Sequence, residues 1–345
     1  MPAKERRARL TNKPAGNRIR QMVIHSSGHL FFNTLCIMRL NSFIQFTLAI
    51  MWAELLQDII KGDIKSLARA ISFVENEKEG YAYLLQNLPV SDTKIIGITG
   101  PPGAGKSTLV DALIGEMVAH QKKVGVLCVD PSSPFNLGAL LGDRIRMSEW
   151  YNHPGVFIRS LATRGSLGGL HPKIIEIADL MKAAGFDHII VETVGVGQSE
   201  IEIAGLADVT IVAMVPEGGD EIQTMKAGIM EIADIFVVNK ADRQGADTFV
   251  KNLRQMYAPA FSNHKTEIEI IKTVASEGEG IELLKNAIDK LISSGKTNQK
   301  KTWLLAEKAY HLLQHKRMKG ITGKWLYEQF SENENMNLYK FISSL

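Results

Sequence analysis

The stretch Gly100-Pro101-Pro102-Gly103-Ala104-Gly105-Lys106-Ser107-Thr108 decides the fold of this 345-residue chain. It matches the pattern G-x-x-x-x-G-K-[ST], follows the apolar run IIGIT at 95–99 and opens a helical segment at 106–121. Glycines let backbone N–H groups turn towards phosphates, and the start of a helix favours an anion. Lys106 is expected to reach the β- and γ-phosphates, and the Ser107 hydroxyl to bind Mg²⁺. These nine residues therefore predict a nucleoside triphosphate site with magnesium.

Short apolar runs alternate with amphipathic segments on the C-terminal side of this loop. Runs of β-branched residues indicate strands buried on both faces, and the alternation with helices indicates a mostly parallel sheet. We therefore expect a doubly wound α/β domain over 93–297, flanked by helical extensions. The further strands are predicted at 124–129, 156–161, 188–193, 209–215, 235–239 and 267–274, and the helices at 106–121, 171–184, 220–232, 246–257 and 280–293.

Helical spacing of apolar residues marks both flanks of this domain. Residues 51–92 are predicted to form a helical hairpin that breaks at Gly62-Asp63, with Asp63 capping the second helix. Residues 298–345 are predicted to form a helical tail, too short to fold alone, that packs on the domain or on a second subunit.

Residues 1–50 differ from the rest of the chain, because a basic start precedes a largely apolar stretch. Three interpretations stay open: a targeting segment, a membrane anchor, or an extension outside the working fold with Met51 as the true start. Arg39 near the middle of the apolar stretch argues against a clean membrane span, since a charge there costs about 2.5–3.5 kcal/mol. We expect a cytoplasmic protein without a membrane partner, or one of an organellar matrix if the segment is a targeting signal.

Composition excludes several other classes of protein. Apolar residues make up 45% and charged residues 22% of the chain, as in ordinary globular proteins, and a net charge of +3 does not indicate nucleic acid as a partner. The two cysteines, Cys36 and Cys128, are far apart and suit a reducing compartment. The nine histidines are scattered, so no dedicated transition-metal site is expected.

Acidic residues at the ends of two predicted strands are candidates for the magnesium shell. Asp130 follows the run 124–129, where α/β domains bind ligands, although it could instead cap a turn or helix. Glu192-Thr193-Val194-Gly195 has the acidic-x-x-Gly form of a nucleotide switch, in which Gly195 offers its amide to the γ-phosphate and Glu192 contacts the magnesium shell. Gln198 is a candidate for orienting the attacking water, but it stands three residues past the glycine, where Val196 is the direct neighbour.

Asn239-Lys240-Ala241-Asp242 follows the run 235–238 and matches N-K-x-D. The Asp242 carboxylate can accept two hydrogen bonds from guanine, whereas adenine would leave it unpaired. Val274-Ala275 stands where a backbone N–H meets the guanine oxygen in such sites. The nucleotide is therefore expected to be GTP or GDP.

Four arginines lie near these motifs and could contact a phosphate or stabilise charge during hydrolysis. Pairing with a carboxylate, or simple solvation, is the alternative for each of them. They are Arg144, Arg146, Arg159 and Arg164.

These motifs and the residues between them resemble one family closely, the methylmalonyl-CoA mutase-associated GTPases (the MeaB/ArgK group of the SIMIBI-class P-loop GTPases). The resemblance runs from about Trp52 to the C-terminus. Its most specific stretches are ITGPPGAGKSTLVDAL (98–113), VDPSSPFNLGALLGDRIRM (129–147), IRSLATRGSLGGL (158–170), VETVGVGQSE (191–200), MVPEGGDEIQTMKAGIMEIADIFVVNKAD (214–242) and ASEGEGIELL (275–284).

The resemblance implies a GTPase that acts as a chaperone for an adenosylcobalamin-dependent mutase, coupling the GTP state to cofactor loading and protection. It implies that 100–108, Asn239, Lys240 and Asp242 bind the nucleotide, that the loop 217–226 contacts the mutase, and that the tail forms a homodimer. The resemblance also implies four candidate residues around magnesium, which are Ser107, Asp130, Asp143 and Glu192.

Two departures from the family's usual pattern are visible. The chain has Asn136-Leu137-Gly138-Ala139 where the family commonly has Thr-Gly-Gly-Ser, and Val274-Ala275 where it usually has Ser-Ala. The second change removes a side-chain hydroxyl from the predicted guanine site.

Two other functions remain as alternatives. A metallochaperone GTPase for a metalloenzyme would usually supply a cluster of His or Cys ligands, which this chain lacks. An ATP-using kinase tied to amino-acid transport would conflict with Asn239-Lys240-Ala241-Asp242, which favours guanine.

Overall fold

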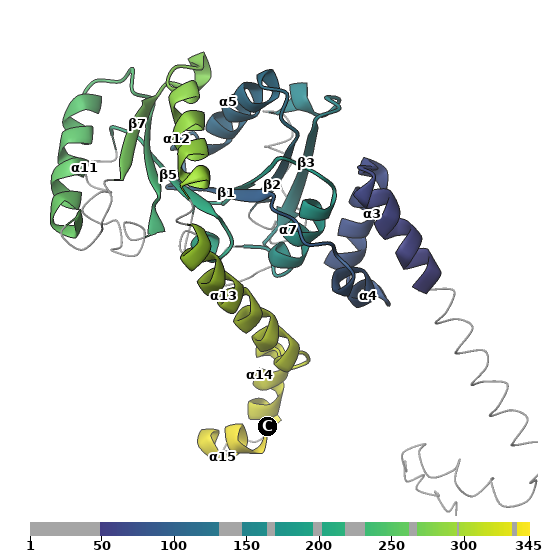
Figure 1. Cartoon of the computed structure of the whole chain (residues 1–345). Helices are drawn as coiled ribbons and strands as arrows, with labels where there is room; N and C mark the ends of the chain where they lie inside the picture. Colours follow the sequence, from purple (N-terminus) through teal and green to yellow (C-terminus); the bar gives the residue numbers. More distant parts are fainter. Residues whose placement is uncertain are drawn as a thin grey trace, which may run out of the picture.

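The computed structural model describes residues 49–130, 147–163, 170–195, 202–217, 232–261, 268–294, 297–332 and 337–345 (Figure 1). The predictions for residues 1–48, for the helix at 220–232 over most of its length, and for Asp143 and Gln198 therefore lie outside the described residues. Arg144, Arg146, Arg164 and the departure at 136–139 lie outside them as well.

Seven parallel strands form one sheet in the order β3-β2-β4-β1-β5-β6-β7, which confirms the predicted fold class. All seven predicted runs become strands, with ends that agree to within two residues. β2, β3 and β4 lie on one side of β1, and β5, β6 and β7 lie on the other. The strand order therefore changes direction at β1, and the carboxyl ends of β1, β4 and β5 meet beside the glycine-rich loop. The strands are β1 (Lys94–Thr99), β2 (Val124–Asp130), β3 (Val156–Ala162), β4 (His188–Glu192), β5 (Val209–Met214), β6 (Ile235–Asn239) and β7 (Glu269–Thr273).

Helices cover both faces of the sheet (Figure 1). On one face, α5 (Lys106–Ala119) and α12 (Ile281–Ser293) share an apolar core with β1, β2 and β5. On the other, α7 (Ile174–Ala183) packs with the N-terminal helices, and α11 (Ala246–Phe261) covers β6 and β7 through Phe249 and Leu253. The predicted helix at 171–184 begins only at Ile174, because residues 171–173 form a turn.

The N-terminal helices break where the sequence predicts. Gly62 has φ +87°, in the left-handed region that favours glycine. The Asp63 carboxylate then caps α3 (Ile64–Glu75) by accepting hydrogen bonds from the backbone N–H groups of Lys65 (2.7 Å) and Ser66 (3.1 Å). A further short helix, α4 (Tyr81–Gln86), makes this unit more than the predicted hairpin. Its core is continuous with that of α7, so the unit is packed on the sheet domain.

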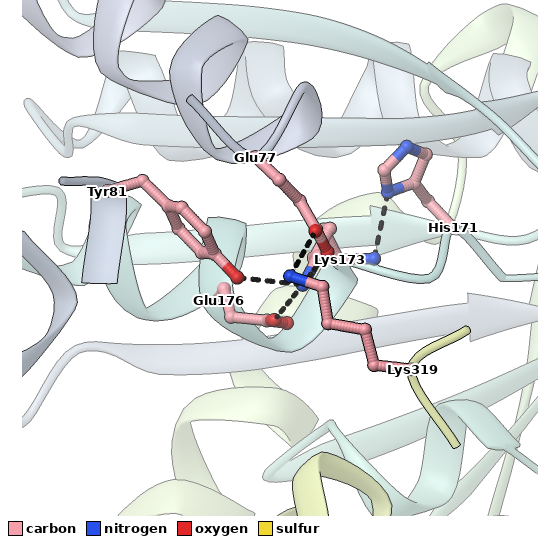
Figure 2. Close-up of polar contacts among 6 residues, drawn as sticks. All are labelled: Glu77, Tyr81, His171, Lys173, Glu176 and Lys319. Atoms are coloured by element: carbon pink, nitrogen blue, oxygen red, sulfur yellow. Dashed lines mark hydrogen bonds and ion pairs between the residues drawn. The ribbon is translucent and has the colours of Figure 1, made fainter. Parts of the chain in front are cut away.

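An ionic cluster centred on the buried Lys173 joins these parts of the chain (Figure 2). Lys173, next to the start of α7 and only 5% exposed, places its Nζ 2.9 Å from Glu77 Oε1 and 3.1 Å from Glu176 Oε1. It also lies 5.3 Å from the centre of the Tyr81 ring. Lys319, in the tail, pairs with Glu77 at 3.3 Å. The cluster, defined by Lys173, Glu77, Glu176, Tyr81 and Lys319, thus links the N-terminal helices, α7 and the tail.

The tail forms α13 (Thr297–Arg317), α14 (Gly323–Glu332) and α15 (Leu338–Ser344), and it runs away from the sheet domain (Figure 1). It contacts α7 through Lys308, which lies 3.9 Å from Asp179. Several large apolar side chains in it are exposed, among them Leu305 (67%), Tyr327 (73%) and Tyr339 (79%). Within the part of the chain that the structure describes, no helix is both long and apolar enough to cross a membrane.

Candidate nucleotide-binding site

The loop 100–105 lies between the end of β1 and the start of α5, as the sequence predicts. Gly100, Gly103 and Gly105 all have positive φ, at +135°, +80° and +81°. At two of them a side chain would also clash, because a Cβ on Gly100 would overlap the carbonyl of Ala213 and one on Gly105 would overlap the amide of Asn239. The glycines therefore let the loop curl tightly at the carboxyl end of the sheet, with the start of α5 behind it.

Lys106 lies buried along the inside of this loop, with 6% of its surface exposed. Its Nζ donates hydrogen bonds to the carbonyl oxygens of Gly100 (2.9 Å) and Pro101 (3.1 Å). Gly195 comes against the same ammonium group, since a Cβ built on Gly195 would clash with Lys106 Nζ and with the Gly100 carbonyl. The structure thus brings together the loop lysine and the glycine of the predicted switch, from segments about 90 residues apart.

Ser107 and Glu192 meet in the interior of the site. The Ser107 hydroxyl donates a hydrogen bond of 2.7 Å to Glu192 Oε1, and the two residues are 7% and 4% exposed. A hydroxyl oxygen beside a carboxylate is the type of donor set that Mg²⁺ prefers, so these two predicted ligands fit the ion. Asp130 ends β2 opposite Ala162 of β3, at the same edge of the sheet.

Two side chains of the N-K-x-D motif form hydrogen bonds to the glycine-rich loop. Asn239 Nδ2 donates to the Ala104 carbonyl at 3.0 Å, and Lys240 Nζ donates to the Gly103 carbonyl at 2.8 Å. Lys240 has φ +56°, unusual for a residue with a side chain. Asp242 is exposed in the turn after β6, where a ligand can reach its carboxylate.

The predicted guanine-oxygen segment is held by the same asparagine. Asn239 Oδ1 accepts hydrogen bonds from the Thr273 hydroxyl and from the backbone N–H of Ala275, both at 3.1 Å. The backbone N–H of Val274 donates a hydrogen bond of 3.1 Å to the Glu279 carbonyl oxygen. The Ala275 N–H that the sequence assigns to guanine is therefore directed at the Asn239 amide in this structure, within the same small group of residues.

Arg159 serves as a packing contact and not as part of this site. It leaves β3 towards α3, where its guanidinium pairs with Glu75 and lies 3.3 Å from the Ser72 hydroxyl. Of the roles considered for Arg159, the structure therefore supports pairing with a carboxylate and not contact with a phosphate.

Two buried threonines lie beside the site, and the sequence motifs assign neither of them a role. The hydroxyls of Thr99 and Thr193 lie 2.9 Å apart at the ends of β1 and β4, and the two residues are 0% and 2% exposed. Thr99 directly precedes Gly100, and Thr193 directly follows Glu192. Both threonines lie at the ends of predicted strands, which is the one feature of the sequence that points to them. The sequence does not predict that β1 and β4 are adjacent in the sheet, so it does not predict the pair.

Residues 67–324 match the family model described as methylmalonyl Co-A mutase-associated GTPase MeaB. The chain belongs to this GTPase family. The resemblance seen in the sequence is thereby confirmed, and so is the assignment of the chain to the P-loop GTP hydrolases.

Relatives in all three domains of life support the membership. A Pyrococcus horikoshii protein named as a GTPase is 44% identical over 294 residues, which is 82% of this chain and 90% of that protein. GTPase ArgK of Escherichia coli K12 is 35% identical, covering 76% of this chain and 85% of its own. The mouse protein named methylmalonic aciduria type A homolog, mitochondrial, is 33% identical, covering 74% and 69%.

A solved structure shares the fold as well. The protein in the crystal structure titled LAO/AO transport system kinase superposes with a TM-score of 0.61 at 26% identity, covering 86% of this chain and 96% of that one. This MeaB-family chain therefore shares its fold with a protein of known structure.

Proposed function

We propose that this GTPase binds GTP and GDP with Mg²⁺ and acts as a chaperone for an adenosylcobalamin-dependent acyl-CoA mutase, methylmalonyl-CoA mutase or a related enzyme. The observation that carries the nucleotide part is the double attachment of Asn239 and Lys240 to the carbonyls of Ala104 and Gly103. It supports the proposal because the N-K-x-D motif lies against the glycine-rich loop, so one nucleotide could span both.

Each group of site residues has a separate role in this proposal. The loop 100–105 and Thr108 surround the phosphates, Lys106 exchanges its present carbonyl partners for phosphate oxygens, and Gly195 offers its amide to the γ-phosphate. Asn239, Lys240 and Asp242 hold the guanine, together with Val274 and Ala275. Asp242 is exposed, so its carboxylate is accessible to the base.

Ser107 and Glu192 would hold the magnesium ion, joined by Asp130 and Asp143. The ion supplies positive charge that offsets charge on the phosphates. The buried Ser107–Glu192 hydrogen bond supports this role, because it already brings a hydroxyl and a carboxylate oxygen together at the start of α5. Gln198 stays the proposed residue for orienting water.

The proposed mutase partner rests on the family description and on the loop that follows β5. Of the loop 217–226, the structure describes Glu217, whose carboxylate pairs with Arg243. Arg243 directly follows Asp242. A partner that moves the loop could in this way affect the guanine-binding turn, and the nucleotide could affect the loop in return.

A homodimer formed through the tail is also proposed. The exposed apolar side chains of α13–α15 support it, because such residues gain stability when a second surface covers them. The tail region proposed for the dimer is 298–345, the N-terminal helical unit is 51–92, and the GTPase domain is 93–297.

The test is GTP turnover by the full chain, with and without an adenosylcobalamin-dependent acyl-CoA mutase from the same source. We expect a slow basal rate that the mutase raises several-fold, together with faster loading of adenosylcobalamin in the presence of GTP. Turnover that the mutase leaves unchanged, with no binding between the two proteins, would overturn the partner proposal and leave the GTPase assignment intact.

A further inference from the structure

Thr99 and Thr193 form a buried hydroxyl pair at the centre of the sheet. β1 and β4 run parallel, with Ile98 opposite Glu192, so Thr99 and Thr193 occupy the next level of the ladder. The backbone N–H of Thr193 still donates to the Ile98 carbonyl at 3.0 Å. The hydroxyl pair, at 2.9 Å, adds a side-chain contact at the level where the two strands end.

Both halves of the phosphate site leave the sheet from this level. Thr99 is followed at once by Gly100, which begins the phosphate loop. Two residues beyond Thr193, Gly195 turns with φ +83° and reaches the Gly100 carbonyl and Lys106 Nζ so closely that no side chain would fit between them. The pair is therefore the last contact between β1 and β4 before the segments that follow them meet again at Gly100 and Gly195.

We propose that the Thr99–Thr193 pair is a positioning element for GTP hydrolysis, which sets where Gly195 stands relative to the phosphate loop. This inference rests on the proposed contact of the Gly195 amide with the γ-phosphate. Neither threonine is among the residues proposed to contact the nucleotide, so the pair acts through Gly195. Hydrogen bonds between buried groups hold geometry well, because a hydroxyl that loses its partner finds no water to replace it.

The pair should matter for GTP and not for GDP, because only GTP carries the phosphate that Gly195 approaches. Thr193→Val keeps the shape of the side chain and removes the hydroxyl. We expect it to lower kcat about tenfold, and to lower the affinity for a non-hydrolysable GTP analogue relative to GDP by a similar factor. GDP affinity itself should stay within about twofold.

Two matched variants separate positioning from simple damage to the fold. Thr193→Ser keeps the hydroxyl and should restore both values to within about twofold of the unmodified protein. Thr210→Val provides the control, because Thr210 is fully buried in the neighbouring strand β5 and its hydroxyl has no hydrogen-bond partner among the described residues. It should leave kcat and the preference for the GTP analogue unchanged.

A double-mutant cycle with Thr99→Val completes the test. If one shared hydrogen bond does the positioning, Thr99→Val should reproduce the effect of Thr193→Val, and the double variant should be no worse than the poorer single one. The proposal is overturned if the two effects multiply independently, if Thr193→Val lowers GDP and analogue affinity equally, or if it changes neither kcat nor the affinity ratio. All of these readings use nucleotide alone, so a missing mutase response would bear only on the partner proposal.

Discussion

Lys173 Nζ lies 2.9 Å from Glu77 Oε1, and this contact joins α7 to the connection between α3 and α4 (Figure 2). Burial by itself would lower the pKa of the Lys173 ammonium, but the hydrogen bond to Glu77 and the charge of Glu176 together raise that pKa above its ordinary value. The pKa of Glu77 is lowered, chiefly by its hydrogen bond to Lys173. Lys173 and Glu77 therefore form a charged pair at neutral pH.

Removing Lys173 should destabilise the protein far more than removing Lys319. Lys173→Met would leave the Glu176 carboxylate buried without its cation, and breaking a buried pair in this way costs about 3–5 kcal/mol. Lys319→Met removes a side chain that is 70% exposed, and exposed pairs contribute about 0–1 kcal/mol. Urea denaturation of both variants measures the difference.

Lys324→Met is the matched control for the tail, because Lys324 pairs with Glu328 inside α14 and is 86% exposed. It should behave as Lys319→Met does in the unfolding experiment. Equal losses for Lys173→Met and Lys319→Met would show that the cluster adds nothing beyond an ordinary surface pair.

Gly195→Ala should slow hydrolysis strongly while the protein stays folded. A Cβ at this position clashes with Lys106 Nζ and the Gly100 carbonyl, and it also meets an unfavourable positive φ that costs about 1–2 kcal/mol. We expect kcat to fall by more than about tenfold, since a displaced Lys106 or Gly195 would lose its proposed contact with the developing charge. Single-turnover GTP hydrolysis measures this directly.

Gly185→Ala separates the two causes, because Gly185 has φ +75° but open space around its Cβ position. It should lower the free energy of unfolding slightly and leave kcat unchanged. If Gly185→Ala slowed hydrolysis as much as Gly195→Ala, backbone strain and not the local clash would be responsible.

Asp242→Asn should weaken guanine binding and permit xanthine instead. Hydrogen bonds to a charged group contribute about 1.5–3 kcal/mol, so we expect GTP affinity to fall about 10- to 100-fold. Xanthine carries a carbonyl where guanine has its amine, and an asparagine amide can donate to it. Competition binding with GTP, ATP and xanthosine triphosphate measures the exchange of preference.

Asp247→Asn is the control, because Asp247 is a nearby exposed carboxylate that pairs with Lys272 at 2.8 Å, outside the motif. It should keep full preference for GTP. Comparable affinities of the unmodified protein for GTP and ATP would contradict the role given to Asp242.

Stability should fall below neutral pH partly because of His188. Burial lowers the pKa of His188, with Lys122 and Lys285 acting in the same direction. The charges of Asp289 and Asp187 oppose this shift without cancelling it. The unfolded chain therefore takes up a proton at a higher pH than the folded one, so the free energy of unfolding decreases as pH falls below about 6.5.

His188→Gln removes this proton uptake. The stability of the unmodified protein relative to the variant should therefore be greater at pH 7.5 than at pH 5.5, as measured by urea denaturation at both pH values. Parallel losses in the two proteins over this range would rule out His188 as a contributor.

The sequence by itself determined the features that depend on neighbouring residues. Unbroken β-branched runs predicted the strands, because a strand buried on both faces must be apolar along its length. The Gly62-Asp63 break and the loop 100–108 could be predicted since turn conformation and capping act over a few residues. The family motifs identified Ser107, Glu192, Asn239 and Lys240 for the same reason, as each lies at a fixed place beside a strand or loop.

The tertiary structure alone decided which of these segments meet. Ser107 and Glu192 are 85 residues apart, Thr99 and Thr193 are 94 apart, and Lys173 reaches back to Tyr81 over 92. No local pattern encodes such pairs, because they depend on the strand order and on how helices pack across the sheet. Arg159 was open in the sequence between a phosphate contact, a carboxylate pair and simple solvation, and no motif marked Lys173. Only the packing of the N-terminal helices against β3 and α7 paired Arg159 with Glu75 and buried Lys173 beside Glu77.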